Sequence, residues 1–194
     1  MQDLNAKYVD IVKAGKELFW KFGIKKVNVA EICHKAEVSR ATFYKYFENK
    51  EKLALYILKS VVDNGILDYS KIMNSDVDFP TKIKMTIQLK LEGSKDLSQE
   101  FLNDIYKDEF FEIAAYFNHE KEESLKRVMN DYQQAQFDGH IRMDLKPEFI
   151  LYIMNKIHEM ITDKNLTVLY ENPSDKIGEI VRFFFYGILS REER

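Results

Sequence analysis

Residues 28–50 contain two short helical patterns with almost no chain between them, and this arrangement constrains the fold more than any other feature. Apolar residues with the spacing of one buried helical face occupy the first pattern: Ile32, Cys33, Ala36 and Val38. The pattern then breaks, and Ser39 is a favourable N-cap for a second short helix that runs to Phe47. Two short helices joined by a tight turn predict a helix-turn-helix.

The second of these helices is predicted to have a buried face and a polar face. Phe43 and Phe47 are four residues apart, so both should point inward and hold the helix against its neighbours. The polar side chains then lie nearer the outside, with Tyr44 at the boundary: Arg40, Thr42, Lys45 and Tyr46. Arginine offers a forked donor for guanine O6 and N7, and threonine can contact a thymine methyl or a phosphate. Tyrosine and lysine commonly hold phosphates; the alternative for each residue is an ordinary exposed polar side chain.

The order V-S-R-A-T-F-Y-K-Y-F-x-x-K-E-K-L, from Val38 to Leu53, resembles the signature of TetR/AcrR-family transcriptional regulators. The resemblance is dense over about residues 7–56 and looser beyond them. It implies that the recognition helix lies at DNA, with Lys50 on a phosphate at the start of the fourth helix. The predicted DNA-binding residues are Asn28, Ser39, Arg40, Thr42, Tyr44, Lys45, Tyr46 and Lys50.

Three positions depart from the family pattern. Glu37 stands where the turn usually carries glycine, and a positive φ costs a non-glycine residue roughly 1–2 kcal/mol. The turn is therefore either strained or differently shaped. Asn28 replaces the usual threonine, which exchanges one good N-cap for another. Cys33 replaces the usual alanine, and we expect a small buried side chain there, since a redox sensor needs an exposed thiolate.

Helical periodicity continues along the whole chain and predicts an all-α fold. The first helix is expected from Leu4 to Phe22, with Gly23 at its C-terminal end. After the helix-turn-helix, helices are expected at about residues 50–74, 80–93, 98–117, 119–138, 147–170 and 173–189. We predict a three-helix DNA-binding domain at residues 1–49 and a larger helical domain for effector binding and dimerisation at residues 50–194.

Charge is divided unevenly between these two parts. Residues 1–50 carry ten Lys or Arg against six Asp or Glu, whereas residues 51–194 carry nineteen against twenty-six. A basic end on a chain of net charge −3 is a cue for contact with nucleic acid at that end. A difference of this size can also arise by chance in solvated helices, so it supports the motif without replacing it.

The last two expected helices are candidates for a dimer interface, because a single short reading helix contacts few base pairs. A two-fold dimer would match a two-fold operator. The resemblance implies that these helices pair with those of a second subunit in a four-helix interface, and Gly187 would allow close approach of the backbones. The alternative is that their apolar stripes fill the core of one subunit. The predicted dimerisation residues are Phe149, Ile153, Ile157, Ile161, Val181, Phe184, Phe185 and Ile188.

The region at about residues 66–145 is rich in aromatic residues, and the resemblance implies a small-molecule pocket within it. Core packing explains the same pattern equally well for any one residue. Glu109 and Glu112 would suit a cationic ligand, although the solvated face of a helix is the simpler interpretation. The predicted ligand-binding residues are Tyr69, Met85, Leu89, Tyr106, Phe110, Tyr116, Phe117, Met129 and Tyr132.

Other classes of protein fit the sequence poorly. It has no Gly-rich phosphate loop or nucleophile elbow, and its four His lack metal-ligand spacing, so we expect no enzyme, metal or cofactor. A single Cys, no apolar run of about 20 residues and no signal-peptide order at the start predict a cytoplasmic protein without membrane association.

The sequence therefore predicts a homodimeric transcriptional repressor that binds a palindromic operator in double-stranded DNA. A small lipophilic effector is expected to release it. The alternative is a DNA-binding architectural or cell-cycle factor of the same fold, which acts through a protein partner and has no small-molecule inducer.

Overall fold

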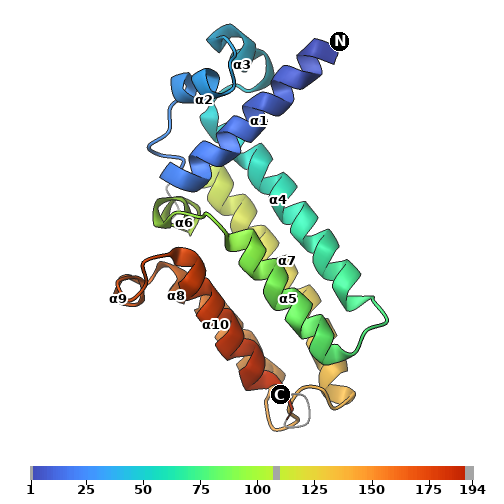
Figure 1. Cartoon of the computed structure of the whole chain (residues 1–194). Coiled ribbons are helices and arrows are strands. Elements are labelled where there is room, and N and C mark those ends of the chain that lie inside the picture. Colours follow the sequence, from blue (N-terminus) through green and yellow to red (C-terminus); the bar gives the residue numbers. More distant parts are fainter. Residues whose placement is uncertain (1, 107–109, 191–194) are drawn as a thin grey trace. The chain divides into compact units, whose positions relative to one another are not determined.

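The computed structural model describes residues 2–106 and 110–190 and confirms the all-α prediction (Figure 1). In these residues the chain is helical apart from turns and one isolated antiparallel bridge between Ile141 and Leu189. None of the helices described is long and apolar enough to cross a bilayer. The helices are α1 Gln2–Phe22, α2 Val29–Lys35, α3 Arg40–Tyr46, α4 Lys50–Met73, α5 Phe79–Ser94, α6 Gln99–Tyr106, α7 Phe111–Phe137, α8 Pro147–Thr162, α9 Lys164–Thr167 and α10 Pro173–Ile188.

Most predicted helix ends lie within two residues of the observed ends, and two predictions are wrong. The break expected near residue 118 lies inside α7, and the observed break separates α6 from α7 instead. The intervening sequence has neither Gly nor Pro, so it carried no breaker signal. The helix expected at residues 147–170 ends at Thr162, because the Asp163 side chain accepts a hydrogen bond from the Leu166 N–H at 2.9 Å and starts α9.

The chain forms two compact units, each made of two stretches of sequence. Unit 1 consists of Met1–Val62 and Asp96–Phe117, and unit 2 consists of Asp63–Lys95 and Asn118–Arg194. The long helices α4 and α7 each contribute residues to both units. Helix α6 belongs to the same unit as the helix-turn-helix.

Unit 1 has a continuous apolar core beneath α1, α2 and α3. Ile11 and Phe19 of α1, Phe43 of α3 and Leu53 of α4 are fully buried in it. At Gly15 a Cβ atom would lie 2.7 Å from Leu53 Cδ2, so α1 and α4 approach closely at this glycine and a larger residue would displace the Leu53 side chain. Several large buried side chains thus fix the platform that carries α3.

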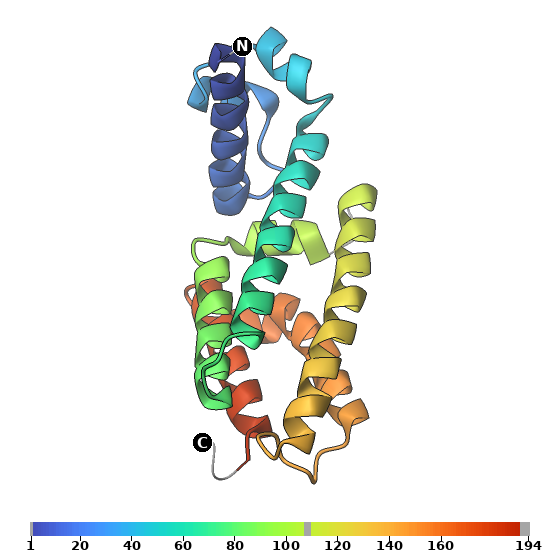
Figure 2. The same cartoon turned by 90° about the vertical axis from the view of Figure 1, so that its right-hand side faces the viewer.

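Unit 2 is built around α10, which packs on α5 and α8 (Figures 1 and 2). A Cβ atom at Gly178 would lie 2.8 Å from Leu91 Cδ2, so α5 and α10 approach closely at this glycine. Lys176 is fully buried, and its ammonium donates to the Ile161 carbonyl at 2.6 Å and to Thr167 Oγ1 at 2.8 Å. Burial lowers the pKa of Lys176, and these hydrogen bonds fasten the corner between α8 and α9 onto α10.

Candidate nucleic-acid interface

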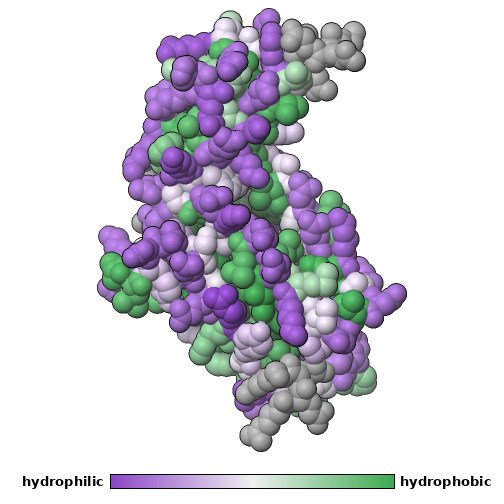
Figure 3. Space-filling view, viewed as in Figure 1, coloured by the Kyte–Doolittle hydropathy of each residue, from purple (hydrophilic) through white to green (hydrophobic). Residues whose placement is uncertain are grey.

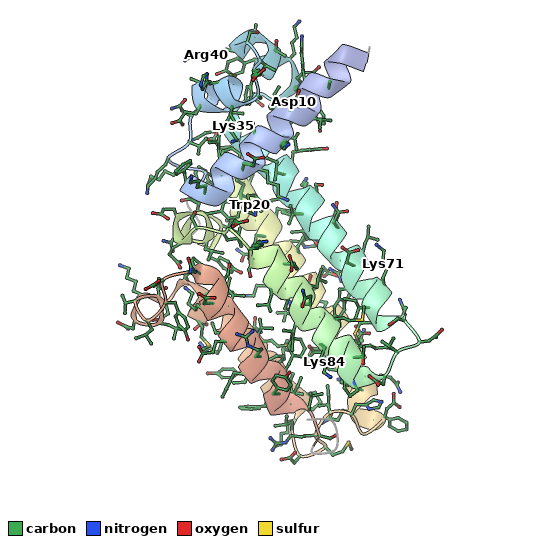
Figure 4. The ribbon with its side chains drawn as sticks, in the orientation of Figure 1. Asp10, Trp20, Lys35, Arg40, Lys71 and Lys84 are labelled. Carbon is green, nitrogen blue, oxygen red and sulfur yellow. The ribbon has the colours of Figure 1, made fainter. Side chains whose placement is uncertain are left out.

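The start of α2 is closed by a capping box. Asn28 Oδ1 accepts a hydrogen bond from the Glu31 N–H at 3.0 Å, and Glu31 Oε2 accepts one from the Asn28 N–H at 2.8 Å. Asn28 is therefore the N-cap that the sequence predicted. At the other end of α2, Lys35 Nζ pairs with Glu17 Oε2 of α1 at 2.8 Å, and this hydrogen bond lowers the pKa of Glu17 (Figure 4).

The turn between α2 and α3 keeps a left-handed backbone without glycine. Glu37 has a φ of 53°, and the Val38 N–H donates to the Cys33 carbonyl at 3.0 Å across the turn. Of the two interpretations of Glu37, the positive φ supports the strained turn, at a cost of about 1 kcal/mol. Cys33 is buried, and burial raises the pKa of its thiol, as expected for a small core side chain.

Helix α3 has the orientation that the sequence predicted. Ser39 Oγ accepts a hydrogen bond from the Thr42 N–H at 3.1 Å, which confirms Ser39 as the N-cap. Phe43 and Phe47 are both buried, 0% and 7% exposed, and their rings lie 6.0 Å apart. Because these two side chains point inward, the opposite side of the helix faces outward.

The outward face of α3 consists of Arg40, Ala41, Tyr44 and Lys45, all of which are exposed. Among the residues that the structure describes, Arg40 makes no hydrogen bond or ion pair, so its forked donor is available (Figure 4). Ala41 was not predicted, because an alanine in the sequence gives no sign that it lies among the reading residues. In Figure 3, hydrophilic side chains cover most of the visible surface of α1 to α3.

Two predicted contacts of α3 are only half-exposed. The Thr42 hydroxyl lies 2.9 Å from the Ser39 hydroxyl, so it takes part in the cap. The Tyr46 ring packs edge-on against Tyr8 of α1, with the ring centroids 5.5 Å apart. Both side chains help to hold α3, and their contact with DNA stays a prediction.

Lys50, a predicted phosphate contact, makes its hydrogen bonds within the protein. Its ammonium donates to the backbone carbonyls of Ile24 at 2.8 Å, Lys25 at 2.9 Å and Val27 at 2.7 Å. A lysine has three N–H donors, so all of them are engaged within the protein. The Lys50 ammonium is therefore not free in this structure, and its contact with a phosphate stays a prediction. Lys50 instead fastens the start of α4 to the loop that leads into α2.

Helix α6 holds the same loop through two carboxylates, those of Asp104 and Glu100. The Lys25 N–H donates to Asp104 Oδ2 at 3.0 Å, and Lys26 Nζ pairs with Glu100 Oε1 at 3.1 Å. Gly23 has a φ of 82°, and a Cβ atom there would lie 2.7 Å from Asp104 Oδ2. These contacts leave no signal in the sequence, because Lys25 and Asp104 are 79 residues apart.

A groove opens beside α3, between the beginnings of α2 and α4. Arg40 and Tyr44 line one wall of this groove. The remaining lining residues are Asn28, Val29, Ala30, Asn49, Lys50 and Glu51. Backbone N–H groups at the start of a helix favour anions, so this groove suits a phosphate backbone that runs alongside α3.

The residues that form this helix-turn-helix match those of a known protein family. Residues 11–57 match the family model described as bacterial regulatory proteins, tetR family. This part of the chain belongs to the TetR family. The family prediction made from Val38 to Leu53 is thereby confirmed.

Individual relatives of the chain cover different shares of it. The transcriptional regulator RutR of Escherichia coli is 31% identical over 96 residues, which are 50% of this chain and 45% of RutR. The dhaKLM operon transcriptional activator DhaS of Lactococcus lactis is 30% identical over 69 residues, 36% of this chain and 33% of DhaS. The chain thus spans less than half the length of both relatives. The crystal structure of regulatory protein TetR from Rhodobacter sphaeroides shares the fold, with a TM-score of 0.74 and 18% identity over 93% of this chain and 98% of that one.

The predicted ligand-binding residues of the chain fall into both units. In unit 1, Tyr106 packs edge-on against Phe117, with the ring centroids 4.8 Å apart. In unit 2, the Tyr69 hydroxyl donates to Asp131 Oδ2 at 2.8 Å, and burial raises the pKa of Tyr69. The remaining predicted residues are Phe110 and Tyr116 in unit 1 and Met85, Leu89, Met129 and Tyr132 in unit 2. Neither unit brings all nine together, so a ligand site stays a prediction.

The two glutamates considered for a cationic ligand have different outcomes. Glu112 forms an exposed ion pair with Lys52, with 2.7 Å between Nζ and Oε2. This pairing supports the solvated interpretation of Glu112. Glu109 lies outside the described residues.

The predicted dimerisation residues need a partial correction. Ile161, Val181, Phe184, Phe185 and Ile188 are buried within unit 2 itself, and Ile153 and Ile157 are half-buried. Among the predicted residues, Phe149 is exposed. The apolar side chains that α8 and α10 expose are Phe149, Tyr152, Met160, Phe183 and Tyr186. Four aromatic residues follow one another at 183–186, so the sequence pattern did not distinguish the two faces of α10.

Proposed function

We propose that this protein is a transcriptional regulator whose α3 enters the major groove of an operator. The observation that carries the proposal is the division of side chains on α3. Phe43 and Phe47 fix the helix from inside. Arg40, which has no hydrogen-bond or ion-pair partner among the described residues, projects from it beside Tyr44 and Lys45. In a helix-turn-helix, the N-terminal residues of the second helix contact the edges of the bases.

Within this proposal, the side chains of α3 have separate tasks. Arg40 is the candidate for bidentate hydrogen bonds to guanine O6 and N7. Lys45 and Tyr44 are candidates for phosphate contacts, which set the register without reading the sequence. The groove beside α3 extends the same surface along the phosphate backbone. Because these contacts release counterions, operator affinity should fall steeply with salt.

The experiment is selection of operator sequences from random duplexes by the full chain, followed by titration of the enriched duplex. Arg40→Ala should weaken specific binding and relax the preference at one base pair in each half-site. Ala6→Gly on the exposed side of α1 is a control that should bind like wild type. If the wild-type chain enriches no sequence, the proposal fails.

We further propose that the protein acts as a homodimer through the exposed apolar side chains of α8 and α10. Phe183, which is 83% exposed, is the largest contributor available on α10. A second copy would bury this surface and match a palindromic operator. Sedimentation should give a dimer for wild type and a monomer for Phe183→Asp. The control Val77→Asp, also at an exposed apolar residue, should remain dimeric.

The effector response is proposed to pass through α6 to the loop before α2. Asp104 holds the Lys25 amide, so a shift of α6 would move the entry into the helix-turn-helix. An effector acts in this way only if it binds the shifted state more tightly. Compounds that raise the melting temperature should be tested for operator release. If every compound that binds leaves operator affinity unchanged, the protein-partner alternative is favoured instead.

We propose repression as the regulatory sign, on the resemblance to the TetR/AcrR family. DhaS is named as an activator, so the sign needs its own test. A reporter under the selected operator should rise when the gene is deleted. A fall in the reporter would indicate activation.

A further inference from the structure

Ala41 is an exposed alanine at the second position of α3, directly after Arg40. It shares the outward face of the helix with Arg40, Tyr44 and Lys45. An alanine side chain is a single methyl group and forms no hydrogen bonds. Among the base edges of the major groove, the group that matches it is the C5 methyl of thymine.

The other candidate for such a contact is Thr42, and the structure assigns it a different task. Its N–H donates to Ser39 Oγ at 3.1 Å, and its hydroxyl lies 2.9 Å from the same oxygen. Thr42 is also half-buried, whereas Ala41 is exposed. The cap therefore engages the N–H and hydroxyl of Thr42 and holds that side chain beside Ser39, whereas the methyl of Ala41 is exposed on the outward face.

We propose that Ala41 reads the C5 methyl of a thymine in each operator half-site, beside the base pair that Arg40 reads. This inference rests on the proposed function, in which α3 enters the major groove. It makes Ala41 a specificity-determining residue and predicts that the enriched operator contains a thymine at the same place in both half-sites. The contact is apolar, so it adds to the hydrogen bonds of Arg40 without competing for the same base atoms.

Replacing thymine with deoxyuridine tests this contact directly, because the two bases differ only in the C5 methyl and pair identically. Each thymine of the enriched operator is replaced in turn, in both half-sites, and affinity for the full wild-type chain is measured. Burial of one methyl predicts a loss of about fourfold in each half-site, or about 15-fold for both, at one thymine position. In Ala41→Gly, the ratio of affinities for thymine and deoxyuridine at that position should fall to about one.

Two further variants distinguish loss of the contact with the thymine methyl from a loss of helix stability caused by glycine. Ala6→Gly, at an exposed alanine of α1, should keep the wild-type ratio at every position. Ala41→Ser keeps a Cβ atom in the helix and places a hydroxyl where the methyl contact would form, so its ratio should also fall.

Several results would overturn the proposal. They are an operator without a thymine common to both half-sites, no position sensitive to deoxyuridine in wild type, or an undiminished ratio in folded Ala41→Gly and Ala41→Ser. Failure to enrich any operator is a different result, since it would remove the proposed function and this inference together.

Discussion

The outward face of α3 and the residues that hold α3 in place lie within the same short stretch of chain, yet they use their side chains in opposite ways. Arg40 and Lys45 point outward, and Arg40 has no hydrogen-bond or ion-pair partner in the described residues. Phe43 is fully buried, and Lys50 has all three N–H donors engaged with backbone carbonyls. The contrast indicates that substitutions in the holding residues change folding stability, whereas substitutions on the outward face change DNA binding alone.

The largest effect is expected at the centre of the holding residues. Phe43→Ala should lower the free energy of unfolding by about 3–5 kcal/mol, because it opens a cavity in the core of unit 1. Chemical denaturation measures this loss, and operator binding should disappear with the fold. A stable Phe43→Ala protein would mean that α3 is rotated relative to this description. The distinction between its outward face and the residues that hold it would then be wrong.

The two lysines provide a sharper contrast, because the sequence assigned both to phosphates. Lys50→Met should lower the free energy of unfolding by about 2 kcal/mol, since three backbone carbonyls lose a charged donor. At an ionic strength where the variant stays folded, the dependence of operator affinity on salt should keep its wild-type slope.

Lys45→Ala is the matched variant on the outward face. It should leave stability within about 0.5 kcal/mol of wild type and flatten the salt slope by about one unit in each subunit. A flattened slope in Lys50→Met with unchanged stability would restore Lys50 as a phosphate contact.

The turn before α3 should give a smaller effect of the opposite sign. Glu37→Gly should raise the free energy of unfolding by about 1 kcal/mol, because glycine adopts the φ of 53° without steric cost. His34→Gly in α2 is the control and should lower stability by about the same amount. If both variants are destabilised, the turn is not strained at Glu37.

The sequence was sufficient to predict those features of the structure that contacts between nearby residues determine. The N-caps at Asn28 and Ser39 and the inward direction of Phe43 and Phe47 depend on neighbours within four residues. The contacts of Lys50 were hidden, because the carbonyls of residues 24–27 lie more than 20 residues away in the chain and backbone acceptors leave no trace in a sequence.

In α10 the sequence did not identify the buried face of the helix, for a different reason. Phe183 and Phe184 are adjacent and chemically identical, yet one is 83% exposed and the other 8%. A helix with aromatic residues on both sides has no pattern that identifies its buried face. Only the packing of α10 against α5 and α8 makes that choice.

Arg40→Ala gives the most direct test of the claim that the outward face of α3 reads DNA. Unfolding free energy and affinity for a series of operators with single base changes are measured on the same preparation. We predict stability within about 0.5 kcal/mol of wild type, together with a loss of about 1–3 kcal/mol in binding and a relaxed preference at one base pair of each half-site. Unchanged affinity and base preference in a folded Arg40→Ala protein would contradict the claim.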